Sequence, residues 1–87
     1  MLRDTGQRFE WSEQGGTCFA DYRVNGDRLS IDYVESPVTL RGTGAAGRLM
    51  TEIAKIAKSK NYKIVPICGY AASWLRRSEE FRDLIAD

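Results

Sequence analysis

The dipeptide Asn25-Gly26 lies between two segments in which polar and apolar residues alternate. Asn-Gly favours a two-residue hairpin turn, because a type I′ turn needs positive φ at both central positions. Residues 17–24 and 28–34 are therefore expected to form two antiparallel strands. Their inward face is expected to carry Cys18, Ala20, Tyr22 and Val24 from the first strand and Leu29, Ile31 and Tyr33 from the second.

A third strand is expected before this hairpin. Residues 8–11 read Arg-Phe-Glu-Trp and alternate in the same way, and a glycine pair at 15–16 supplies turn chemistry. The three strands form an antiparallel meander, with Trp11, Phe19 and, further along the chain, Trp74 expected in the core. Residues 1–6 are polar and are expected to lack regular structure.

The pattern changes after Ser36-Pro37, where the chain enters a glycine-rich stretch at 41–47. Apolar residues then recur with helical spacing at Ala46, Leu49, Met50, Ile53, Ile56 and Ala57, which predicts a helix over 46–59. A short apolar strand at 62–67, a helix at 70–77 and a final turn at 79–85 follow.

The element order is therefore β-β-β-α-β-α. A helix that connects two strands of one sheet forms a crossover, so the third and fourth predicted strands should be parallel. The expected fold is an α/β (α+β) domain with a mostly antiparallel sheet and one parallel junction. A chain of 87 residues is too short for two cores, so residues 1–87 are expected to form one domain.

Composition argues against several classes of function. Thirteen basic and twelve acidic residues give a net charge of +1, which argues against a nucleic-acid partner. No signal peptide or membrane span is evident, and two cysteines are too few for a disulfide framework, so a cytoplasmic location with no membrane partner is expected. The chain has no histidine, which removes the commonest zinc ligand and the commonest general base, and no metal site is expected.

The sequence Gly42-Thr43-Gly44-Ala45-Ala46-Gly47 matches the G-x-G-x-x-G pattern. A dinucleotide fold would also need an acidic residue about 20 positions later, and residues 63–68 contain none. A phosphate-binding P-loop would need Lys and then Ser or Thr after its last glycine, whereas Arg48 and Leu49 follow here. What remains is a loop of small residues that opens a helix, where backbone N–H groups bind anions well. A close-packed helix entry without a ligand is the alternative at this stage.

The loop and three further phrases in register resemble the GNAT superfamily of N-acetyltransferases, in particular its very short members. Arg41-Gly42-Thr43-Gly44-Ala45-Ala46 fits the R/Q-x-x-G-x-G/A pyrophosphate signature of that family. The sequence is also similar to these short members around three further phrases: Tyr33-Val34-Glu35-Ser36-Pro37, Val65-Pro66-Ile67-Cys68 and Arg76-Arg77-Ser78-Glu79-Glu80-Phe81. The family has histidines where this chain has Tyr33 and Ser78, so a mechanism that needs either imidazole cannot operate here.

The resemblance implies acetyl-CoA as cofactor, held where the strand before the loop splays away from the strand after the helix. It implies backbone contacts from the strand residues Tyr33, Val34 and Glu35. It further implies pyrophosphate contacts from the loop residues Arg41, Gly42, Thr43, Gly44, Ala45 and Ala46.

Three side chains are catalytic candidates by the same resemblance. Cys68 could act as nucleophile or base, Tyr70 could protonate the departing CoA thiolate, and Glu35 could be a base. Each has a plainer interpretation: a packed thiol for Cys68, an ordinary helix residue for Tyr70 and a solvated carboxylate for Glu35.

The sequence thus predicts an acetyl-CoA-dependent N-acetyltransferase that acts on a primary amine, with a small amine or a peptide as acceptor. A non-catalytic acetyl-CoA-binding module or sensor is the alternative. An RNA- or phosphate-binding domain would rest on Arg41, Arg48 and Lys58 alone, and the near-neutral charge counts against it.

Overall fold

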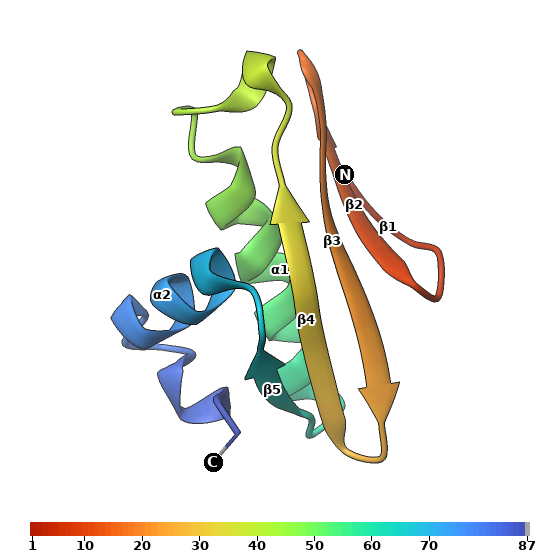
Figure 1. Ribbon diagram of the computed structural model, residues 1–87, viewed down its shortest axis with the longest axis vertical. Helices are drawn as coiled ribbons and strands as arrows, with labels where there is room; N and C mark the ends of the chain where they lie inside the picture. The colour runs from red at the N-terminus through yellow and green to blue at the C-terminus, as the bar shows by residue number, and fades with distance from the viewer. Residues whose placement is uncertain (87) are drawn as a thin grey trace.

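The computed structural model of the chain describes residues 1–86 and contains one five-stranded sheet with the strands in sequence order, β1-β2-β3-β4-β5 (Figure 1). Strands β1 to β4 are antiparallel to one another along the sheet, and β5 runs parallel to β4. The strands are β1 Leu2–Asp4, β2 Arg8–Glu13, β3 Gly16–Asn25, β4 Arg28–Glu35 and β5 Lys63–Pro66. The helices are α1 Ala45–Ser59 and α2 Gly69–Arg77, with short 3-10 turns at Val38–Leu40 and Arg82–Leu84. The α/β fold class and the parallel junction are confirmed.

The N-terminal residues form a strand, so the expectation of irregular structure at 1–6 was wrong. β1 pairs with β2, with Leu2 opposite Trp11. The carboxylate of Asp4 accepts hydrogen bonds from the Tyr22 hydroxyl at 2.5 Å and from the Gly6 N–H at 2.8 Å. These bonds tie β1 to β3 and close the turn that follows it, a tertiary contact that a strand of three residues does not reveal in sequence.

Tyr33 lies on the opposite face of the sheet from Leu29 and Ile31, contrary to the expected alternation. The pairing of β3 with β4 shifts between Asp21 and Tyr22, where Asp21 opposes Tyr33 but Tyr22 opposes Ile31. Asp32 is therefore an extra residue, and this β-bulge reverses the facing of everything after it. Val34 turns toward the core, and Tyr33 is left 47% exposed.

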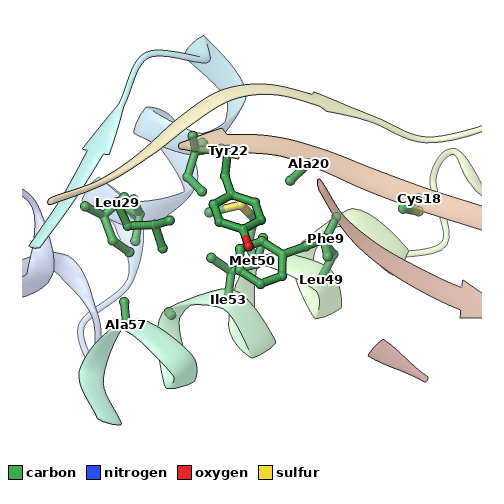
Figure 2. Packing of buried hydrophobic residues seen from close by; sticks show 14 of the residues in the cluster. Phe9, Cys18, Ala20, Tyr22, Leu29, Leu49, Met50, Ile53 and Ala57 are labelled. Carbon is green, nitrogen blue, oxygen red and sulfur yellow. The ribbon is translucent and has the colours of Figure 1, made fainter. Parts of the chain in front are cut away.

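The core lies between the sheet and α1, and α2 adds Ala71 and Leu75 to the same cluster. Figure 2 shows the ring of Phe9 against that of Tyr22, above Met50 and Ile53 of α1. The two rings stack with centroids 4.1 Å apart. The predicted helical stripe is confirmed at Leu49, Met50, Ile53 and Ala57, which are fully buried, whereas its members Ala46 and Ile56 are only partly buried.

The other face of the sheet is polar. It carries ion pairs between neighbouring strands, among them Arg8 with Asp21 and Arg23 with Asp32. Phe19 lies on this face under the Arg8 guanidinium, 3.8 Å from it, so its expected place in the core was wrong. Trp11 and Trp74 are partly buried and pack against the core.

The burial along α1 predicts a difference between two isoleucines of the same helix. Ile53 is fully buried, whereas Ile56 is only partly buried. Ile53→Ala should lower the free energy of unfolding by about 2–5 kcal/mol, because it leaves a cavity under the sheet. Ile56→Ala removes the same atoms with the same gain in helix propensity and should cost clearly less. Urea unfolding of both variants measures the difference, and equal losses would contradict this account of the core.

Candidate functional site

A cleft of about 370 Å³ opens where β4 ends and α1 begins. Pairing between β4 and β5 stops at Ile31 opposite Pro66, and in Figure 1 the upper half of β4 has no strand on its α2 side. The cleft occupies this region, and Tyr70 of α2 closes it from the side. Its lining residues are Val34, Glu35, Ser36, Leu40, Arg41, Gly42, Gly44, Ala46, Gly47 and Tyr70.

Two glycines with positive φ shape the loop that forms one wall of the cleft. Gly42 has φ of 79° and Gly44, which caps α1, has φ of 85°. Residues with a Cβ rarely adopt this conformation, so both positions favour glycine. Between them Thr43 braces the loop, since its hydroxyl donates to the Leu40 carbonyl at 2.6 Å and accepts from the Ala45 N–H at 3.3 Å.

Four backbone N–H groups of this wall have no hydrogen-bond partner within residues 1–86. They belong to Gly42, Gly44, Ala46 and Gly47, and all four residues line the cleft. Two of them are in the first turn of α1, where the helix dipole adds partial positive charge. The wall is therefore suited to bind an anion such as a diphosphate, through backbone donors that need no side chain.

The first turn of α1 is also bonded to the end of β2. Arg48 makes an ion pair with Glu13 at the end of β2, and Glu13 accepts a further hydrogen bond from the indole of Trp11. The hydrogen bonds from Arg48 and then from Trp11 lower the pKa of Glu13 to about 2. Glu13 is therefore ionised at neutral pH, and the ion pair with Arg48 is charged on both sides there.

Tyr70 and Glu35 both line the cleft, but the side chain of Glu35 is on the polar face of the sheet, beside that of Tyr33. Tyr70 is 40% exposed, and partial burial of its hydroxyl raises its pKa above the usual value, so the phenol is protonated at neutral pH. Glu35 lines the cleft and accepts a hydrogen bond from the Tyr33 hydroxyl at 2.9 Å. That bond also raises the pKa of Tyr33.

The two cysteines occupy different environments. Cys68 is the half-buried N-cap residue of α2, and its N–H donates to the Ile31 carbonyl at 3.0 Å, next to the point where β4 and β5 part. Cys18 is fully buried, with its Sγ 3.1 Å from the hydroxyl of Ser36. Neither thiol is among the residues that line the cleft.

The cleft thus brings together part of the expected site. Val34, Glu35, Arg41, Gly42, Gly44, Ala46 and Tyr70 line it, whereas Tyr33, Thr43, Ala45 and Cys68 do not. Ala45 is fully buried beneath the loop, and Tyr33 is on the polar face of the sheet because of the bulge. Sequence reasoning missed Ser36, Leu40 and Gly47 as lining residues. Gly47 could have been predicted as a lining residue, since it is the last glycine of the G-x-G-x-x-G pattern. Nothing in the sequence marks Ser36 or Leu40 as lining residues.

A family model described as GCN5-related N-acetyl-transferase matches residues 8–84 of the chain. The solution structure of a GCN5-like protein from Staphylococcus aureus has a similar fold, with a TM-score of 0.72 and 19% sequence identity. The similarity covers 99% of this chain and 87% of the other. No curated protein matches the sequence of the chain. No helix in residues 1–86 has both the length and the hydropathy of a membrane span.

The lowered pKa of Glu13 predicts a pH-dependent contribution to stability. The folded pKa of about 2 is below the reference value of 4.5, so the stabilisation is complete above about pH 4.5 and is lost as the pH falls toward 2. The urea midpoint of the native chain should be higher than that of Glu13→Gln at neutral pH. The difference between the two midpoints should shrink as the pH falls from about 4.5 toward 2. A difference that stays constant with pH would contradict the ionised pair.

Proposed function

Because the chain belongs to the GCN5-related N-acetyltransferase family, we propose that it transfers an acetyl group from acetyl-CoA to a primary amine. The observation that carries the proposal is the set of four unpartnered N–H groups of Gly42, Gly44, Ala46 and Gly47 along the cleft. The diphosphate of CoA is the anion that this wall would bind, with Arg41 at its edge. Residues 1–87 would act as one acetyl-CoA-binding unit in the cytoplasm.

The pantetheine arm would lie along the end of β4. Beyond Ile31 this strand has no β5 partner, so the backbone at Val34 and Glu35 is open to the cleft. Tyr33 is one residue closer to the junction with β5 and would contribute only backbone groups, since its side chain is on the other face. Backbone donors held in this way are preorganised to stabilise the oxyanion that forms at a thioester carbonyl.

Three side chains would handle protons and geometry. The amine nitrogen attacks the thioester carbonyl carbon, a C–N bond forms, and the C–S bond breaks with the electron pair left on sulfur. Glu35 would accept the proton lost by the amine through a water molecule, because its side chain is on the polar face of the sheet beside that of Tyr33. Tyr70 would give its proton to the departing thiolate, and its raised pKa keeps that proton available at neutral pH. Cys68 would position the reacting group or serve as a base.

A non-catalytic acetyl-CoA-binding module is the second candidate. The absence of histidine from the sequence favours it, because the commonest general base of proteins is missing. Incubation with labelled acetyl-CoA and a panel of amines and peptides separates the two. Label transferred to an acceptor supports the transferase, whereas bound but unconsumed acetyl-CoA supports the module.

Gly44→Ala should weaken acetyl-CoA binding at least about tenfold, as measured by calorimetry. The new Cβ is unfavourable at φ of 85° and would lie 3.1 Å from Nη1 of Arg48, so the loop must shift. Gly26→Ala is the matched control, because Gly26 also has positive φ, at 64°, but lies in the hairpin turn with nothing within 4 Å of the new Cβ. Equal acetyl-CoA affinity of the two folded variants would refute the loop as the diphosphate site.

Cys68→Ala should lower turnover on whichever acceptor is found, with acetyl-CoA affinity little changed, because the thiol is placed beside the strand junction and away from the loop. Intact mass after incubation with acetyl-CoA alone should show no acetyl adduct, since direct transfer needs no covalent intermediate. An adduct that Cys68→Ser abolishes would instead establish a nucleophilic cysteine. Normal turnover by Cys68→Ala would remove Cys68 from the catalytic residues.

A further inference from the structure

The turn between β2 and β3, residues 13–16, lies against the cleft loop although about 25 residues separate them in sequence. β2 and β3 close at Glu13 opposite Gly16. The turn contacts the chain both before and after the loop residues 41–44, and none of its own four residues lines the cleft. Its contacts therefore act on the loop from behind.

In the upstream contact, the backbone of the turn at Gly15 and Gly16 packs against residues 37–40. The Thr39 hydroxyl donates to the Gly15 carbonyl at 2.5 Å. A Cβ built on Gly16 would be only 2.9 Å from Cγ of Pro37 and 3.2 Å from the Thr39 hydroxyl oxygen. The turn is thus packed at backbone distance against the 37–40 segment, which leads directly into Arg41.

The downstream contact is made by Glu13 and Arg48. Nε and Nη2 of Arg48 donate to the two carboxylate oxygens of Glu13, at 2.5 and 2.8 Å. Nη1 is the nitrogen left over, and it is 3.1 Å from the position that a Cβ of Gly44 would occupy. The two-point pairing with Glu13 therefore fixes the guanidinium plane against the backbone of Gly44.

We propose that the 13–16 turn is a positioning device for the cleft loop, in which Glu13 acts through Arg48 to hold Gly42 and Gly44 in the geometry that binds a diphosphate. The inference rests on the proposed function, since the diphosphate is that of acetyl-CoA. Glu13 is a positioning residue, because it does not line the cleft. Fixing the loop in advance raises affinity by reducing the conformational freedom that is lost on binding.

The carboxylate of Glu13 does not oppose this role. It accepts hydrogen bonds from three N–H donors, two of Arg48 and one of Trp11 at 2.5 Å, so its charge is compensated locally. Arg48 is itself 49% exposed in its side chain, so its charge is also screened by solvent. The expected contribution of the pair is therefore the geometry of the loop rather than a net attraction for the ligand.

The test compares two ligands on the full chain by calorimetry or NMR titration. Acetyl-CoA contains the diphosphate, and S-acetylpantetheine lacks it. Glu13→Gln should weaken acetyl-CoA binding about five- to tenfold, because the loop must then be ordered on binding, and leave S-acetylpantetheine affinity unchanged. Arg48→Lys keeps the charge but loses the two-point geometry and should show the same ligand dependence.

Glu10→Gln is the matched control. Glu10 is in the same strand and makes its long ion pair with Arg3, at 3.9 Å, on the polar face of the sheet. The same change of charge there should leave both affinities as in the native chain. In an Arg48→Gln background, Glu13→Gln should have no further effect if Glu13 acts through Arg48.

Three results would overturn the inference: unchanged acetyl-CoA affinity of Glu13→Gln, equal losses for both ligands, or tighter binding of acetyl-CoA. Failure of the native chain to bind acetyl-CoA would instead refute the proposed function. NMR order parameters of residues 42–46 in the free protein give a second, ligand-independent readout. They should fall in Glu13→Gln and stay unchanged in Glu10→Gln, and no change in Glu13→Gln would also count against the device.

Discussion

The short parallel pairing of β4 with β5 determines where a ligand can lie. It covers four residues on each strand and ends at Ile31 opposite Pro66. Proline has no N–H to continue the ladder, and the N–H groups of Ile67 and Cys68 both converge on the single carbonyl of Ile31. Because two successive N–H groups bind the same carbonyl, residues after Pro66 no longer pair in register with β4. The remaining residues of β4 keep an open edge, and the cleft lies at that edge.

The bulge at Asp32 then assigns side chains to the two faces of that free end. One extra residue turns Val34 inward, toward the cleft, and Tyr33 outward, where its hydroxyl donates to Glu35 on the same polar face. Without the extra residue the tyrosine ring would point toward the core side, where the cleft opens. The parting of the strands provides the space, and the bulge keeps a large side chain out of it.

Much of this architecture can be predicted from local sequence, and the reasons for the failures are physical. Local sequence determines the Asn25-Gly26 turn, the helical stripe of α1 and the crossover. The meander and the parallel junction can therefore be predicted from it. β1 depends on the contact of Asp4 with Tyr22, and the facing of Tyr33 depends on a bulge that no residue type marks. The loop could be recognised from its glycines, because positive φ at Gly42 and Gly44 restricts these positions largely to glycine. Ser36 and Leu40 reach the cleft only through the path of the folded chain.

Net charge says little about the anion affinity of such a site. The whole chain carries only +1, and Arg48 beside the loop is already paired with Glu13. Besides Arg41, the local field of the cleft comes from backbone N–H groups at Gly42, Gly44, Ala46 and Gly47 and from the dipole of α1, neither of which enters a count of charged residues. Backbone donors are also fixed by the fold, so their orientation is maintained without the entropy that a flexible lysine would lose. A nearly neutral chain of this size can therefore present a strong anion site, provided that the loop geometry is held, and this is why the contacts behind the loop matter as much as the groups that face the cleft.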